Sequence, residues 1–167
     1  PYFLPGTRPD LYLPLDGSVD RAIGASWPDM TVESSSDRWV PGVRGQAHQG
    51  QLILKAPRLL QAKGGALEFW MQPVAWSNVT DKGQCILKAD DFFTLYTWNG
   101  GRWSPLKRLT LYFRVGEGEA RHLVFLGDRL RTHVYPGQWT HVVVSWDADA
   151  VDLYLDGRHA GRLVESL

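Results

Sequence analysis

The sequence predicts an all-β domain, built as a two-sheet antiparallel β-sandwich of the jelly-roll type. Apolar residues recur at period two along most of the chain, and no window keeps the i, i+3, i+4, i+7 pattern of an amphipathic helix over three turns. Aromatic residues make up 12% of the chain, and its 17 Gly and 10 Pro favour tight turns. Many short strands without helices to cover a parallel sheet indicate two packed antiparallel sheets.

Turn residues separate the segments that carry the strand pattern. The clearest strands are expected at 66–73, 92–98, 108–115, 122–127, 140–147 and 151–157, and weaker ones at 11–15 and 51–55. The region from Ser18 to Gln49 is rich in Ser, Asp and Gly, so we expect it to be irregular and to wrap one edge of the sandwich.

Length and charge narrow the possible functions. With 167 residues, the chain is expected to form a single domain over 1–167 that folds without a metal or a disulfide. Its 18 basic and 18 acidic side chains give no electrostatic footprint for nucleic acid or an anionic membrane. The chain has no apolar stretch long enough to span a bilayer, no signal-peptide pattern and no initial Met, so we expect no membrane insertion and an origin in a larger multidomain protein. The lone Cys85 is expected to be a small buried group.

Four segments of the chain resemble the concanavalin A-like jelly rolls of the laminin-G-like type. They are "LYLPLDGSVD" (11–20), "PGVRGQAHQG" (41–50), "GALEFWMQP" (65–73) and "PGQWTHVVVSWDADAVDLYLDGRHAG" (136–161). The resemblance implies two curved antiparallel sheets, a binding function toward glycans or proteins, and often a structural Ca²⁺. Because fold does not fix function, the site must decide between these functions.

The last of these segments has a hairpin pattern of its own. Alternation places Val142, Val144 and Trp146 on one face. The next strand is expected to set Val151, Leu153 and Leu155 opposite them. An Asp-Gly turn at 156–157 then reverses the chain again, since such turns favour positive φ.

An enzyme is one alternative, because glycoside hydrolases occur on the same kind of jelly roll. Retaining hydrolysis needs two carboxyl groups about 5 Å apart. No strand carries the E-x-D-x-x-E pattern of the laminarinase-like branch, Asp90 and Asp91 are adjacent, and Glu68 stands alone between apolar residues. We therefore expect no catalytic residues. The five His lack the spacing of a local zinc-ligand pair.

Calcium leaves less trace in a sequence, because its oxygen ligands can be scattered. Asp16 matches the acidic position that the family has early in the chain, and Asp20 follows in the same segment. The resemblance therefore implies a structural Ca²⁺ held by Asp16 and Asp20. The alternative is that Asp16 and Gly17 form a turn with an Asx hydrogen bond, and the sequence leaves both readings open.

The eight Trp fall into groups with different expected roles. Trp70, Trp139 and Trp146 lie in strands among apolar neighbours, so we expect them to be structural. Trp27 and Trp39 could either plug the end of the sandwich or face solvent.

The stretch "YTWNGGRW" (96–103) contains the candidate ligand site. A two-residue turn at Gly100-Gly101 would set Trp98 opposite Trp103 and Asn99 opposite Arg102. We expect Trp98, Trp103, Tyr96, Asn99 and Arg102 to form the site, and Trp76, in a polar loop, to extend it. Aromatic rings with a few polar anchors are typical of a carbohydrate site. The alternative is an aromatic pair that only stiffens the hairpin.

These observations favour a non-catalytic carbohydrate-binding, lectin-like module. We expect it to be secreted or at the cell surface, next to other domains such as a polysaccharide-degrading enzyme, and to bind a glycan or polysaccharide. The alternative is an extracellular protein-interaction or adhesion domain, as laminin-G-like domains often are.

Overall fold

The computed structural model of the chain is built from antiparallel strands. It describes residues 11–12, 23–24, 31–55, 64–73, 84–89, 93–99, 107–113, 121–125, 137–147 and 150–164. Every strand pair within these ranges is antiparallel, which confirms the predicted all-β class. In the same ranges there is no helix, and hence none that could cross a membrane.

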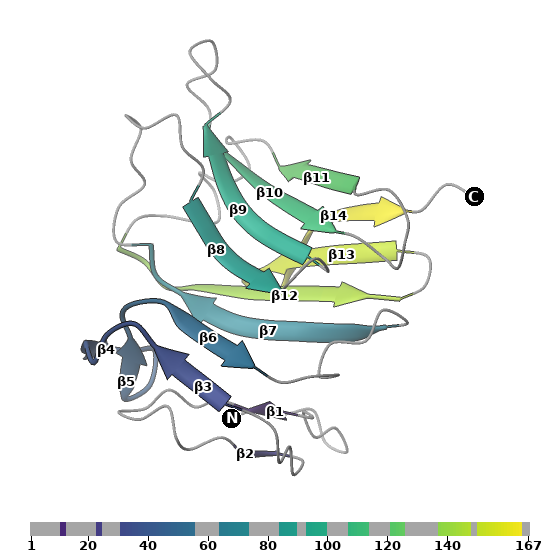
Figure 1. Cartoon of the computed structure of the whole chain (residues 1–167). Coiled ribbons are helices and arrows are strands. Elements are labelled where there is room, and N and C mark those ends of the chain that lie inside the picture. The colour runs from purple at the N-terminus through teal and green to yellow at the C-terminus, as the bar shows by residue number, and fades with distance from the viewer. Residues whose placement is uncertain are drawn as a thin grey trace. The chain divides into compact units, whose positions relative to one another are not determined.

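The chain divides into two compact units, Pro1–Leu60 and Gln61–Leu167. The described residues of the first unit form three two-stranded sheets, in which β1 pairs with β2, β3 with β6 and β4 with β5 (Figure 1). Its strands are β1 (Leu11–Tyr12), β2 (Ile23–Gly24), β3 (Thr31–Ser34), β4 (Trp39–Pro41), β5 (Gln46–His48) and β6 (Leu52–Lys55). Four of them lie between residues 18 and 49, so the prediction of an irregular region there is wrong. These strands have only two to four residues each, too few for a period-two pattern to stand out.

In the part of the second unit that the structure describes there are two four-stranded sheets, with strand orders β11-β10-β9-β8 and β14-β13-β12-β7. Its strands are β7 (Gly65–Met71), β8 (Gln84–Ala89), β9 (Phe93–Asn99), β10 (Lys107–Phe113), β11 (Arg121–Phe125), β12 (Thr140–Trp146), β13 (Ala150–Leu155) and β14 (Arg158–Val164). Residues of β11 contact residues of β14, so the two sheets meet along these strands (Figure 1). All six clearest predicted strands are present, with ends shifted by at most two residues.

The core of the second unit follows the alternation read from the sequence. The register sets Val142 against Leu155, Val144 against Leu153 and Trp146 against Val151, as predicted. All six side chains are buried, and Leu95 of β9 is fully buried as well. Full burial of an aliphatic side chain contributes roughly 1.5 to 3 kcal/mol, so these rows supply much of the stability of the unit.

The predicted Asp-Gly turn joins β13 to β14. Asp156 and Gly157 have φ of 50° and 74°, as a two-residue type I′ turn requires, and Leu155 pairs with Arg158 across it. Asp156 also ties this turn to β12: the His141 N–H donates to Asp156 Oδ1 at 2.9 Å, and the Asp156 N–H donates to the His141 carbonyl at 2.9 Å.

Two strands of the second unit, β8 and β14, were missing from the prediction. Both are irregular, with a register shift between Cys85 and Leu87 in β8 and a bulge opposite Leu153 and Tyr154 in β14. A bulge interrupts the period-two pattern from which strands are recognised.

Cys85 is exposed, so the expectation of a buried thiol is wrong. It lies at the irregular point of β8, which ends the strand order of its sheet.

Candidate functional site

The predicted ligand residues lie at and beyond the end of β9. Tyr96, Trp98 and Asn99 are among the last four residues of that strand. Trp76, Arg102 and Trp103 lie outside the described residues, as do the predicted calcium ligands Asp16 and Asp20. The grouping of these residues therefore stays a prediction.

The register between β9 and β10 corrects one part of that prediction. Trp98 pairs with Arg108 and Asn99 with Lys107, so residues 100–106 link the strands and Trp98 does not pair with Trp103. A two-residue turn would have placed Pro105 opposite Tyr96 inside the ladder, where proline has no N–H to donate. The observed partner of Trp98 is residue 108, five positions beyond the predicted partner, residue 103. Because five is an odd number, each residue of the partner strand lies on the opposite face of the sheet from the one that the prediction gave it.

The sheet β14-β13-β12-β7 has a polar and aromatic face on the side opposite the core. Strand alternation assigns to this outer face Ala66, Glu68, Trp70, His141, Val143, Ser145, Asp152, Tyr154, His159 and Arg162. All of them are exposed or half-buried, whereas the positions that alternate with them on β12 and β13 are buried. The outer face is therefore accessible over all four strands.

Trp70 belongs to the outer face, so its prediction as a core residue is wrong. Its side chain is 49% exposed. Neighbours along a strand point to opposite faces, and Phe69 is the one that pairs with buried Val142. The same expectation is confirmed for Trp146, which is 6% exposed, while Trp139 is half-buried just before β12.

Trp70 forms a small cluster with His141 and Glu68. Trp70 and His141 are register partners, and their ring centroids lie 4.7 Å apart with the planes tilted by 30°. His141 Nε2 lies 2.8 Å from Glu68 Oε1, and the Glu68 side chain is 65% exposed. The cluster thus combines an accessible indole with an imidazole and a carboxylate that hold each other in place.

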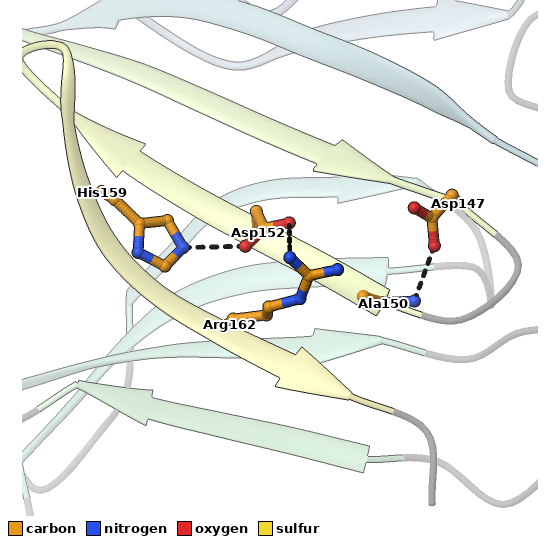
Figure 2. Close-up of polar contacts among 5 residues, drawn as sticks. All are labelled: Asp147, Ala150, Asp152, His159 and Arg162. Carbon is orange, nitrogen blue, oxygen red and sulfur yellow. Dashed lines mark hydrogen bonds and ion pairs between the residues drawn. The ribbon is translucent and has the colours of Figure 1, made fainter. Parts of the chain in front are cut away.

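A second cluster lies on the other side of the outer face, around Asp152 (Figure 2). Asp152 Oδ1 lies 2.7 Å from His159 Nε2, and Oδ2 lies 3.8 Å from Arg162 Nη1. The rings of Tyr154 and His159 lie 5.1 Å apart at 60°. His159 and Arg162 are both about half exposed, whereas Asp152 is 16% exposed, so the carboxylate lies beneath the two basic groups.

The first unit contains a serine-histidine contact that could be mistaken for a catalytic pair. Ser34 Oγ lies 2.7 Å from His48 Nε2, which also lies 2.8 Å from the Ser36 carbonyl oxygen. The other ring nitrogen, Nδ1, is buried and has no hydrogen-bond partner among the described residues, so no carboxylate there orients the ring as in a catalytic triad. With Trp39 packed edge-on against it at 5.4 Å, His48 fastens β5 to the end of β3 and to β4.

Family comparison agrees with this architecture. A family model described as the concanavalin A-like lectin/glucanases superfamily, of the laminin-G type, matches residues 46–166. The chain belongs to this superfamily. The match confirms the resemblance read from the sequence and, with the two antiparallel sheets, the jelly-roll β-sandwich. No curated protein and no solved structure matched the chain.

Membership of the superfamily leaves several functions open, because it includes carbohydrate-binding and adhesion domains and both enzymes and non-enzymes. Metal binding has no support in the part of the chain that the structure describes, where no three His, Cys, Asp or Glu residues are grouped as metal ligands. The outer face carries the best-defined candidate site among the described residues, and sequence reasoning missed it. The available signal was Glu68, a charged residue that shares its strand face with Trp70.

Proposed function

We propose that this chain is a non-catalytic carbohydrate-binding module that holds a glycan by aromatic stacking and hydrogen bonds. The observation that carries the proposal is the half-exposed indole of Trp70, flanked by His141 and Glu68. A large aromatic ring left in water on a rigid strand is a candidate contact for a ligand.

The chemistry of the cluster suits a sugar. The apolar C–H face of a sugar ring can pack on the indole, while the carboxylate of Glu68 accepts hydrogen bonds from its hydroxyl groups. Because His141 and Glu68 hold each other at 2.8 Å, the carboxylate is already oriented before a ligand arrives, which lowers the entropic cost of binding.

An adhesion domain that binds a protein is the second class in the superfamily. The centre of a protein interface is depleted of charged residues. The outer face instead carries Glu68, Asp152 and Arg162 next to its aromatic rings. This mixture favours a hydroxyl-rich ligand over an apolar protein surface.

The carboxylates of the outer face do not support hydrolysis. Glu68 pairs with Val143 on β12, and Asp152 pairs with Ser145, so the two are separated by two strand spacings and two residues along the strand. Their Cα atoms are then about 12 Å apart. Glycosidases aim two carboxyl groups at one bond from about 5 to 9.5 Å apart, whereas here Glu68 is bound to His141, and Asp152 to His159 and Arg162, which favours binding without catalysis.

The proposal includes the wider setting expected from the sequence. The module would act outside the cell or on its surface, beside a polysaccharide-active domain of a larger chain, and a structural Ca²⁺ would be held near Asp16 and Asp20. The predicted residues at the β9 end, Trp98 and Asn99, would form a further contact with the glycan.

A glycan array tests the proposal. The purified chain is applied with and without a calcium chelator, next to Trp70→Ala and the control Ile53→Ala, which removes an apolar side chain that is 42% exposed elsewhere. Binding to a defined class of glycans that Trp70→Ala weakens and Ile53→Ala leaves intact supports the proposal. Silence across the array by a folded chain, with capture of a protein partner, supports the adhesion class instead.

A further inference from the structure

The bulge in β14 decides which side chains reach the outer face. Leu153 pairs with Gly161 and Tyr154 with His159, so Ala160 is the extra residue. His159 and Arg162 are three positions apart, and in a regular strand an odd separation puts two residues on opposite faces. The bulge brings both to the side of Asp152, where the three side chains meet (Figure 2).

The cluster around Asp152 contains more groups than a purely structural ion pair needs. Tyr154 places an aromatic ring against His159 at 5.1 Å, and the half-exposed Arg162 contacts the same carboxylate, Asp152, as His159 does. Asp152 contacts Arg162 only at 3.8 Å, longer than a hydrogen bond, which leaves most of the five guanidinium N–H donors to other acceptors. An aromatic ring beside charged hydrogen-bonding groups repeats the pattern of the Trp70 cluster.

The register fixes the spacing of the two clusters. Trp70 pairs with His141 on β12, Val143 is two residues further along, and Val143 pairs with Tyr154 on β13. Two strand spacings and two residues of rise place the Cα atoms of Trp70 and Tyr154 about 12 Å apart on one face. Half-buried Val143 lies between them, so the floor that joins the clusters is apolar.

From this arrangement we infer that the outer face is one extended binding surface with two subsites. Trp70, His141 and Glu68 form the first subsite, and Tyr154, His159 and Arg162 form the second. The ligand is an oligosaccharide of at least a trisaccharide, laid diagonally across β7, β12 and β13, with one sugar on Trp70 and a later one on Tyr154. The inference deepens the proposed function and rests on it.

The affinity of this surface should depend on the length of the oligosaccharide. A monosaccharide can occupy only one subsite, whereas a trisaccharide or longer chain reaches both, and the second contact then forms within an existing complex. If stacking on Tyr154 is worth about as much as an ordinary aromatic contact, affinity rises about tenfold when the sugar chain becomes long enough.

The experiment is a titration of the whole chain with neutral and uronic acid oligosaccharides, from monosaccharides to hexasaccharides, made from cellulose, xylan, mannan, chitin and pectin. Tyr154→Ala and Arg162→Ala probe the second subsite, and Tyr154→Phe retains the ring. Arg158→Ala is the matched control, because Arg158 is an exposed arginine of the same strand that pairs with inward-facing Leu155. The melting temperature of each variant verifies folding.

We expect a step of about tenfold in affinity between disaccharides and longer chains, lost in Tyr154→Ala, reduced in Arg162→Ala, and kept in Tyr154→Phe and Arg158→Ala. Arg158→Ala should leave the affinity for every sugar unchanged, and the loss in Tyr154→Ala should be larger for trisaccharides and longer chains than for monosaccharides. Binding that depends on Trp70 but is independent of chain length and of Tyr154 overturns the two-subsite inference and leaves the proposed function standing. Absence of binding to every sugar overturns both.

Discussion

The indole of Trp146 packs directly against the backbone of Gly65, its register partner on β7. A Cβ atom added at Gly65 would come within 2.7 Å of Trp146 Cζ2 and 3.2 Å of Cη2. Trp146 is 6% exposed and belongs to the row of core residues on β12, so its ring cannot move away freely. The glycine is therefore required by close approach of a core side chain.

Gly65→Ala should destabilise the protein by about 1 to 3 kcal/mol, the usual cost of overpacking a core. Denaturant unfolding measures this free energy. In the Trp146→Phe background, which lacks the benzo ring carrying Cζ2 and Cη2, the same substitution should cost much less. Equal costs in the two backgrounds would show that the Gly65 and Trp146 contact is not the cause.

Where the period-two pattern is unbroken, sequence and structure agree closely. The rows of Val142 with Leu155 and Val144 with Leu153, and the Asp-Gly turn, follow from alternation and from turn chemistry alone. The failures have physical causes: bulges in β8 and β14 interrupt the period, and strands of two to four residues in the first unit are too short to show one.

The candidate site was harder to predict because face assignment depends on a single residue. In "EFW", Phe69 and Trp70 cannot both face the core, and the register gives the core position to Phe69. His141 reaches Glu68 from another strand, so no local pattern reveals the contact. For β14, only the bulge explains why His159 and Arg162 share a face.

Trp70→Ala should weaken glycan binding by about tenfold and lower stability by less than about 1 kcal/mol, because the ring is already half exposed. Calorimetric titration and thermal melting on the same samples measure the two effects. Trp146→Ala is the contrasting variant, since loss of a buried Trp typically costs about 3 to 5 kcal/mol. A Trp70→Ala protein that melts early yet binds normally would make Trp70 structural.

The chain alone should release no reducing sugar from polysaccharides. The reason is that Glu68 and Asp152 are bound by neighbouring basic side chains on the outer face, and that the sequence lacks a paired-carboxylate pattern. The assay uses the pure chain on a panel of plant and microbial polysaccharides. Sugar release that Glu68→Gln or Asp152→Asn abolishes, with folding retained, would establish an enzyme instead.

Calcium should raise the melting temperature if the family-implied site at Asp16 is present, because a ligand that binds only the folded state stabilises it by mass action. A calcium concentration about 100 times the Kd contributes about 2.7 kcal/mol. Thermal melts with EDTA and with added calcium measure the shift, and Asp16→Ala should abolish it. Identical melting curves under all these conditions would show that the folded chain has no stabilising Ca²⁺ site at Asp16.

Trp98→Ala and Trp103→Ala should each weaken glycan binding by about tenfold, since stacking on an indole contributes roughly 1 to 2 kcal/mol. The corrected register no longer pairs these two residues. Trp98 is the penultimate residue of β9, at the end of that strand.

The stability cost of either substitution should then stay below about 1 kcal/mol. Affinity and melting temperature are measured together for both variants, beside Trp70→Ala. The pairing separates a ligand contact from a structural one: a steep fall in melting temperature, with the folded fraction still binding at full affinity, would assign Trp98 and Trp103 to packing. Glycan contacts would then be confined to the outer face around Trp70.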